Sequence, residues 1–241
     1  MGYDYEKGKQ RVESILNIST SVENIDSIPK DETKWTYDNG VKSWVTAIFV
    51  DLRESTEFFS KAKKEDVART IRAYASEIIE IMNLSTLVRE IGVRGDCVYG
   101  IFSSPNKQTE NELFSLCIWI NTYIKMLNKL LKNKNLNPVK AGIGMATSED
   151  LIIKAGKKGS GINEKVWIGE ALAKADHLSK VTCKSNGNKT TPSPIAISST
   201  SYINIKDFSN RKELLEKHPH QDYYTSNAIK IEMNNWMNSN I

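Results

Sequence analysis

Long hydrophobic runs are missing from this sequence of 241 residues. No stretch reaches the roughly 18 apolar residues that a membrane-spanning helix needs, so we expect no contact with a membrane. The first residues, Met1 to Glu6, lack the basic and apolar regions of a secretory signal peptide. These absences predict a cytoplasmic protein.

Cysteine is also scarce, with Cys97, Cys117 and Cys183 as the only three. An odd number at wide spacing provides neither a disulfide framework nor the spacing of a zinc site, and it fits a reducing cytoplasm. The net charge is only +4, and the lysines are scattered rather than gathered in one stripe. We therefore expect no nucleic-acid partner, although the charge suits a small polyanionic ligand.

The composition, 39% hydrophobic and 26% charged, is typical of an ordinary soluble protein. Residues 1–40 are polar and are interpreted as an N-terminal extension with a helix over 9–16. Residues 41–241 form the predicted catalytic domain. Its length is sufficient for one sizeable hydrophobic core.

Hydrophobic patterns predict the elements of this domain. Trp44 to Val50 is apolar on both faces and too short for a helix, which indicates a buried strand. Apolar residues three and four apart predict a helix over 54–83. We further predict a hairpin over 86–102 with its turn at 94–96, a loop over 103–111, a helix over 113–131, a strand over 139–146, a turn over 156–161, a helix that follows residues 167–169 and ends near 180, a loop over 185–194, and strands over 195–198 and 223–231. This alternation indicates an α/β sandwich in which helices cover a sheet.

Two acidic residues occupy positions suited to a metal site. Asp51 follows the buried strand, and Asp96 lies at the tip of the hairpin. On neighbouring strands they would meet at one edge of the sheet, where their repulsion favours a cation, and Mg²⁺ or Mn²⁺ prefers such hard oxygen ligands. A pair of this kind can hold two metals, one that activates an attacking oxygen and one that binds a triphosphate. The alternative for Asp51 alone is an ordinary turn residue, which the presence of Asp96 disfavours.

The residues after Asp51 form a strand-to-helix turn that includes Arg53, Ser55 and Thr56. The backbone N–H groups at such a helix start favour phosphate. The alternative is that Ser55 or Thr56 only caps the helix.

Four segments resemble, in order, the motifs of the class III nucleotidyl cyclases. Residues 49–56 resemble the first metal motif, Phe-x-Asp-Ile-Arg-x-Phe-Thr, and residues 94–102 resemble the second, which begins with Gly-Asp. Residues 139–147 are similar to the Gly-Ile-Gly strand, and residues 166–178 to the helix that follows Trp-Gly. The resemblance extends over about residues 44–205. It implies the family's fold, a ferredoxin-like, palm-type βαββαβ sheet covered by helices.

The resemblance also implies roles for these residues. Asp51 and Asp96 would ligate two Mn²⁺ or Mg²⁺ ions with help from the carbonyl group of Leu52, and the turn from Arg53 onward would hold the phosphates. The family works as a head-to-tail dimer, so a homodimer with two shared sites is expected. Lys230 is a candidate for the phosphate-binding lysine that these cyclases carry near their C-terminus.

The residues that read the base depart from the family. The lysine and aspartate that recognise adenine fall on Gly92 and Val166, and the substitutes that recognise guanine are missing too. A site that reads a base by hydrogen bonds cannot lose its polar partners and keep its specificity. Arg94 has the strand parity of Gly92, so we expect it in the same cleft, where it could donate to a pyrimidine. The alternative for Arg94 is a surface or inter-chain salt bridge. This pattern resembles the bacterial pyrimidine cyclases of the Pycsar antiphage systems.

The pair that stabilises the transition state departs as well. The family's asparagine falls on Ala173 and its arginine on His177. His177 could donate to phosphate, as could the neighbouring Lys174, and both are predicted catalytic residues. The alternative for His177 is an ordinary half-exposed helix residue.

The sequence therefore predicts a metal-dependent lyase that converts UTP to 3′,5′-cyclic UMP and diphosphate, a second messenger for a separate effector in antiphage defence. CTP, or ATP read by other residues, is an alternative substrate. A catalytically inactive nucleotide-binding or dimerisation module is the alternative from another class. The loss of the asparagine and arginine favours this module, and the two aspartates argue against it.

Overall fold

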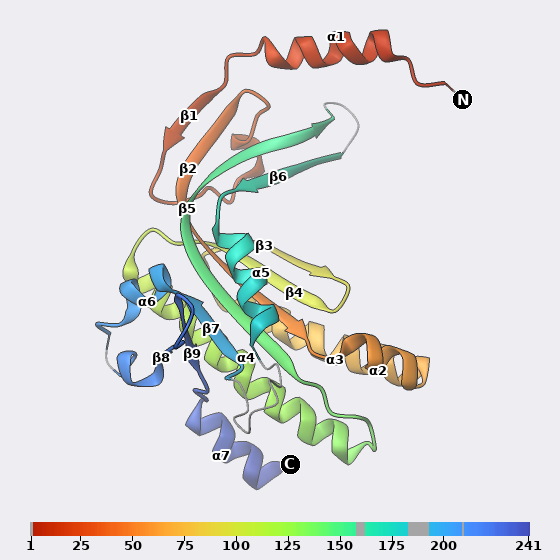
Figure 1. The fold of residues 1–241 in the computed structure, drawn as a ribbon, viewed down its shortest axis with the longest axis vertical. Helices are drawn as coiled ribbons and strands as arrows, with labels where there is room; N and C mark the ends of the chain where they lie inside the picture. The colour runs from red at the N-terminus through yellow and green to blue at the C-terminus, as the bar shows by residue number, and fades with distance from the viewer. Residues whose placement is uncertain (1, 158–161, 183–192, 209) are drawn as a thin grey trace.

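The computed structural model describes residues 2–157, 162–182, 193–208 and 210–241 (Figure 1). The helices are α1 (Tyr5–Leu16), α2 (Ser55–Lys61), α3 (Lys64–Asn83), α4 (Lys107–Asn133), α5 (Ala171–Val181), α6 (Ser199–Ile205) and α7 (Ile231–Asn240), with short 3₁₀ turns η1 (Glu32–Lys34) and η2 (Lys212–Leu214). The strands are β1 (Ser21–Asn24), β2 (Asn39–Leu52), β3 (Val88–Arg94), β4 (Cys97–Ser103), β5 (Ala141–Lys157), β6 (Ile162–Ile168), β7 (Ile195–Ser198), β8 (Glu216–Lys217) and β9 (Tyr223–Ser226). No helix among the described residues is long and apolar enough to cross a membrane.

One sheet organises the molecule, in the order β3-β4-β2-β5-β7-β9-β8, with β1 added beside β2 and β6 beside β5. The central strand β2 pairs antiparallel with β4 on one side and with β5 on the other. The chain order β2, α2–α3, β3, β4, α4, β5 is the predicted βαββαβ core. Helices cover the sheet, as the sandwich prediction requires.

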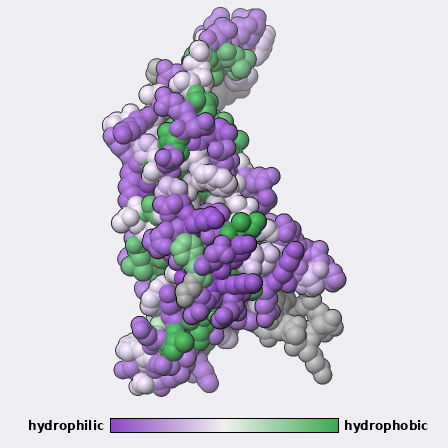
Figure 2. Space-filling model, turned by 90° about the vertical axis from the view of Figure 1, so that its left-hand side faces the viewer, coloured by the Kyte–Doolittle hydropathy of each residue, from purple (hydrophilic) through white to green (hydrophobic). Residues whose placement is uncertain are grey.

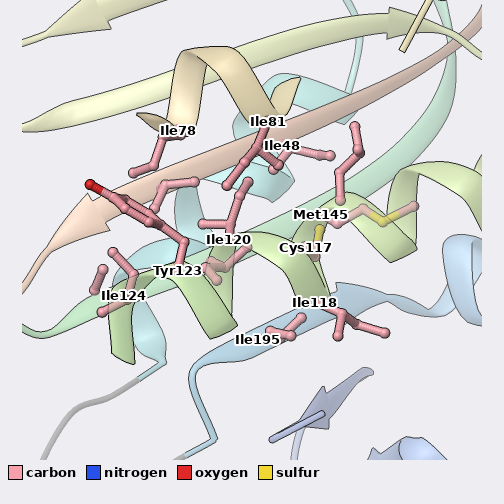
Figure 3. Close-up of a cluster of buried hydrophobic side chains, with 14 of the residues drawn as sticks. Ile48, Ile78, Ile81, Cys117, Ile118, Ile120, Tyr123, Ile124, Met145 and Ile195 are labelled. Carbon is pink, nitrogen blue, oxygen red and sulfur yellow. The ribbon is translucent and has the colours of Figure 1, made fainter. Parts of the chain in front are cut away.

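The two faces of β2 carry different neighbours. Ile48, Val50 and Leu52 belong to the main core beneath α3 and α4, part of which Figure 3 shows with Ile78, Ile120 and Met145. Val45 and Ala47 belong to a second cluster that includes α5. Because side chains alternate along a strand, Asp51 shares the face of Val45 and Ala47 and is directed toward the α5 side of the sheet.

Helix α5 lies very close to β5, and two glycines of that strand make this possible. A Cβ atom at Gly144 would lie 2.0 Å from the Ala175 carbonyl oxygen, and one at Gly142 would lie 2.1 Å from the Ser179 carbonyl oxygen. Both of these carbonyl oxygens belong to the backbone of α5, which cannot move away as a flexible side chain could. The Gly-Ile-Gly motif therefore sets the distance between α5 and the end of the sheet that carries Asp51.

The N-terminal region has two parts. Helix α1 lies at one end of the molecule, away from the other helices (Figure 1). The residues after it join the main body, because β1 pairs with the start of β2 and both Ile28 and Trp35 are buried. The division at residue 40, between an extension and a catalytic domain, stays a prediction.

Several predicted bounds are wrong. The helix over 54–83 is two helices, because Lys63 has an extended backbone (φ −61°, ψ 140°) between α2 and α3. The loop over 103–111 contains the first turn of α4, which Asn106 caps by accepting a hydrogen bond from the Thr109 N–H at 3.0 Å. The strand over 139–146 is longer, since β5 continues to Lys157 and pairs with β6, which was not predicted.

The C-terminal prediction is also partly wrong. The strand over 223–231 ends at Ser226, and residues 231–240 form α7 instead, while α6 was not predicted. The predicted turn over 156–161 and loop over 185–194 lie largely outside the described residues. On the face of the molecule that Figure 2 shows, hydrophobic residues form separate small patches within a mainly hydrophilic surface.

Candidate active site

Asp51 and Asp96 lie on neighbouring strands at one end of the sheet. Asp51 pairs with Cys97, the first residue of β4, and Asp96 belongs to the turn that joins β3 to β4. Both carboxylates line one cavity of about 770 Å³, to which α5 also contributes. We call it the carboxylate cavity. The structure thus brings together the two aspartates that the sequence placed at a common edge.

The carboxyl group of Asp51 is largely buried, with 14% of its side chain exposed. Burial is the main cause that raises its pKa, and the charges of Asp96 and Asp176 act in the same direction. The Arg53 guanidinium, whose Nη2 lies 3.5 Å from Asp51 Oδ2, opposes them. A cation in this cavity would reduce the electrostatic repulsion between the carboxylates. Carboxylate oxygens are also the hard ligands that divalent cations such as Mg²⁺ prefer. These residues therefore fit a divalent cation of the Mg²⁺ or Mn²⁺ type.

Protein side chains would supply only part of the ligand shell. Among the residues that the structure describes, no group of three or more His, Cys, Asp or Glu could hold a metal ion. Burial raises the pKa of the neighbouring Cys97 to about 12, so its thiol stays protonated at neutral pH. Leu52 ends β2 with its side chain in the main core, and its carbonyl group as a metal ligand stays a prediction.

The predicted phosphate turn lies beside the carboxylate cavity. Arg53 and Ser55 line a second cavity of about 370 Å³, whereas Thr56 is exposed and lines neither. Arg53 Nη2 donates to the Ser179 carbonyl group of α5, and the Arg53 N–H donates to the Lys140 carbonyl group at 2.8 Å. Arg53 therefore ties the end of β2 to α5 and holds Asp51 in place.

Tyr99 occupies the space that a side chain at position 92 would need. Gly92 pairs with Tyr99 across β3 and β4, and a Cβ atom at Gly92 would lie 2.4 Å from Cζ of the Tyr99 ring. The ring stacks on Phe49, with 5.3 Å between the centroids. A lysine at the adenine-reading position would therefore displace Tyr99. Arg94 lines the carboxylate cavity, as its strand parity indicated.

Glu90 is a cavity residue that the sequence reasoning missed. Its Oε1 accepts a hydrogen bond from the Tyr99 hydroxyl at 2.9 Å, and its Oε2 accepts one from Trp167 Nε1 at 2.8 Å. The carboxylate therefore connects β3, β4 and β6 and fixes the Tyr99 ring. Its parity, the same as that of Gly92 and Arg94, was the available signal.

Helix α5 presents different residues to two cavities. Asp176 and Lys180, which the sequence reasoning did not single out, line the carboxylate cavity. Lys174 and His177 line another cavity of about 360 Å³, together with Ser198, Asp222 and Tyr223. We call it the histidine cavity. Ala173 lines both. The structure therefore does not bring Lys174 and His177 together with Asp51 and Asp96 within one chain.

Two further predicted positions lie outside both cavities. Val166 on β6 is 37% exposed and is not among the residues that line either cavity. Lys230 precedes α7, and its Nζ lies 5.0 Å from the centroid of the Trp119 ring. Within one chain, the candidate phosphate lysine is thus directed elsewhere.

Two relatives named uridylate cyclase match the chain over almost its whole length. The one from Treponema porcinum is 47% identical over 242 residues, which cover 99% of this chain and 82% of the relative. The one from Gulbenkiania mobilis is 33% identical over 257 residues, which cover 99% of this chain and 97% of the relative. The chain belongs to the uridylate cyclase family. No protein-family model matches the sequence.

Solved structures agree on the fold of this uridylate cyclase family member. An adenylyl cyclase-like ATP-binding protein from Pseudomonas aeruginosa has a TM-score of 0.72 at 15% identity, covering 95% of this chain and 48% of that one. The adenylyl cyclase CyaB from the same species has a TM-score of 0.64 at 19% identity, covering 80% and 97%. The predicted class III cyclase fold and the predicted resemblance to pyrimidine cyclases are both confirmed.

Proposed function

We propose that this protein converts UTP to 3′,5′-cyclic UMP and diphosphate in the carboxylate cavity. The observation that carries the proposal is the placement of Asp51 and Asp96 at one end of adjacent strands, within one cavity. Membership of the uridylate cyclase family supports the substrate and the reaction.

The residues would divide the chemistry between them. Asp51 and Asp96 would bind two divalent cations, Mn²⁺ or Mg²⁺, and Arg53 would hold Asp51 toward them. When bound, such cations lower the pKa of the ribose 3′-hydroxyl and stabilise the charge of the diphosphate leaving group. The 3′-hydroxyl would attack the α-phosphorus and diphosphate would leave. Ser55 would help to hold the phosphate chain, whereas Thr56 lies outside both cavities.

The walls of the cavity favour a small base. Tyr99 fills the space beside Gly92, stacked on Phe49 and held by Glu90, so the cavity has less room for a purine on this side. Arg94 supplies donors that match the carbonyl oxygens of uracil. Cytosine also carries a carbonyl oxygen, so CTP is the alternative substrate.

We further propose that two copies of the chain share each site. Lys174 and His177 line a cavity that is separate from Asp51 and Asp96 of the same chain. In a head-to-tail homodimer, these residues of one copy would approach the phosphates held by the other. His177 and Lys174 would then donate to the negative charge that develops at the α-phosphate.

The test is to incubate the purified protein with UTP, CTP, ATP or GTP, in Mn²⁺, in Mg²⁺ and in EDTA, and to identify the products by mass spectrometry. We expect cyclic UMP from UTP with either metal and none in EDTA. Formation of cyclic CMP alone would show that the substrate is CTP instead of UTP. Formation of cyclic AMP alone would contradict the proposal of a pyrimidine substrate. If no cyclic product forms from any nucleotide, the proposal of an enzyme is contradicted, and the alternative of a catalytically inactive binding or dimerisation module is favoured.

The wider role follows from the product. We propose that cyclic UMP acts in the cytoplasm as a second messenger in antiphage defence and is read by a separate effector protein. Bacteria that express the chain and its effector should resist phage, and Asp51→Asn should abolish the resistance. Equal resistance with the variant would contradict this role.

A further inference from the structure

Asp176 and Lys180 form an ion pair on the side of α5 that faces the carboxylate cavity. Lys180 Nζ lies 2.6 Å from Asp176 Oδ2, one helical turn away. Both residues line the cavity that contains Asp51 and Asp96. Among the described residues, Lys180 is the only lysine in that lining.

Pairs with this spacing are common on exposed helices and usually contribute little. Lys9 and Glu13 of α1 form one, with 3.4 Å between Nζ and Oε1 and with 75% and 53% of the side chains exposed. The corresponding values for Lys180 and Asp176 are 52% and 37%. What distinguishes the two pairs is their surroundings, because Lys180 also lines the cavity that contains Asp51 and Asp96.

The charges around Lys180 keep it protonated. Its pKa is raised chiefly by the hydrogen bond to Asp176, and the charge of Asp51 acts in the same direction. Lys180 in turn acts on Asp51, whose pKa it lowers. The ammonium group is therefore a fixed positive charge within electrostatic range of the proposed metal ligands.

A nucleoside triphosphate in this cavity would require such a charge. The cavity is lined by the carboxylates of Asp51, Glu90, Asp96 and Asp176, so an incoming polyanion meets negative charge first. Divalent cations would neutralise Asp51 and Asp96. Arg94 also lines this cavity and is the proposed partner of the base. Arg53 is occupied with the Ser179 carbonyl group and Asp51, and Lys174 lines the other cavity.

We propose that Lys180 binds the triphosphate of a nucleotide held by Asp51 and Asp96 of the same chain, and that Asp176 positions its ammonium group. The inference rests on the proposed function, of which it names a further substrate-binding residue. The two sides of α5 then have different roles. Lys180 would bind the nucleotide held by its own chain, whereas His177 would donate to the nucleotide held by the other copy.

Binding is measured by calorimetry with 3′-deoxy-UTP and Mg²⁺, because this analogue lacks the attacking hydroxyl and cannot be cyclised. Lys180→Met should weaken its binding by about 10- to 100-fold, the usual effect of removing one charged hydrogen bond. The affinity for UMP should change less than about twofold, since UMP lacks the outer phosphates. Lys180→Arg keeps the charge and should restore most of the affinity for 3′-deoxy-UTP.

Lys9→Met is the matched control, because it breaks an exposed pair of the same spacing far from the cavity. Asp176→Asn should weaken binding less than Lys180→Met does. The double variant should be no weaker than Lys180→Met alone, because Asp176 acts through Lys180. Melting curves identify any variant that fails to fold, and Lys180→Arg then still tests the proposal.

Lys180→Met that binds 3′-deoxy-UTP as tightly as Lys9→Met would overturn the proposal, as would an equal loss of UMP binding. Both results are independent of turnover. The proposed function fails separately, when wild-type protein forms no cyclic UMP, so the two failures are distinguishable.

Discussion

The carboxylate cavity and the histidine cavity meet at α5, yet they are built differently. The carboxylate cavity has its main residues on the strands β2, β3 and β4, with a stacked aromatic wall and a glutamate that holds it. The histidine cavity combines residues of α5 with Ser198 at the end of β7 and with the residues before and at the start of β9. The first contains the two carboxylates proposed to hold the metal-bound triphosphate, and the second contains the donors Lys174 and His177 with, among the described residues, a single carboxylate, that of Asp222. In the proposed homodimer, each cavity would form one half of a shared site.

The largest expected effect is on the carboxylate half. Asp51→Asn keeps the shape of the side chain and removes the charge that would hold the cation, so cyclic UMP formation should fall by at least about a thousandfold. The measurement is product formed from UTP in Mn²⁺, with the melting temperature as a check of folding. Asp31→Asn, on an exposed loop, is the control. Substantial activity in Asp51→Asn would contradict the proposal that the reaction takes place in the carboxylate cavity.

The next effect concerns the histidine half. His177→Ala should lower kcat by about 10- to 100-fold, because one donor to the developing phosphate charge is lost. The KM for UTP should change little, since the metal-bearing half still binds the substrate. Steady-state kinetics measure both. An increase in KM at constant kcat would show that His177 contributes to substrate binding rather than to the transition state. The histidine cavity would then have the same role as the carboxylate cavity, which contradicts the comparison.

A smaller effect tests the aromatic wall. Gly92→Lys places a Cβ atom against the Tyr99 ring, so we expect about 10-fold less cyclic UMP and a free energy of unfolding lower by about 1–3 kcal/mol, as for an overpacked site. Denaturant unfolding and product assays measure the two. Gly2→Lys is the control, because no atom lies within 4 Å of a Cβ atom there. A stable variant that gains activity on ATP would show that the Tyr99 ring moves freely.

The smallest expected effect is a change in the pKa of Asp51, which should respond to charges on only one side of α5. In metal-free protein, the negative charge of Asp176 raises the pKa of Asp51 and the positive charge of Lys180 lowers it. Asp176→Asn should therefore lower the pKa of Asp51, and Lys180→Met should raise it. His177→Ala should leave it unchanged, because His177 is directed to the other cavity. Carboxyl NMR titration measures all three, and a shift in His177→Ala as large as the others would contradict the separation.

The sequence predicted the elements that depend on local pattern. The short run of β2 that is apolar on both faces, and the apolar spacing of three and four along α3 and α4, indicate the sheet and its covering helices. Asp51 and Asp96 were correctly placed together, because a strand end and a hairpin tip are local features. The first turn of α4 was missed because its signal, the capping by Asn106, is a single side-chain contact.

The rest depends on contacts between distant residues. That Gly92 leaves room for Tyr99 follows only from the register of β3 on β4. The two sides of α5 were not distinguished either, because helical spacing alone does not say which side faces Asp51. Lys174 and His177 were expected to act in a site shared between two chains, and the structure places them in a cavity separate from Asp51 and Asp96 of the same chain.

The most direct test of the shared site uses mixed dimers. Asp51→Asn and His177→Ala chains are co-expressed with two different tags, and the dimer that carries both tags is purified and assayed with UTP. One of its two sites combines the intact Asp51 of one copy with the intact His177 of the other, so it should regain about half of wild-type activity. A mixed dimer of wild type with the Asp51→Asn, His177→Ala double variant has no intact shared site and should remain impaired. The opposite pattern, with activity only in the second mixture, would mean that each chain carries its own complete site and would contradict the account.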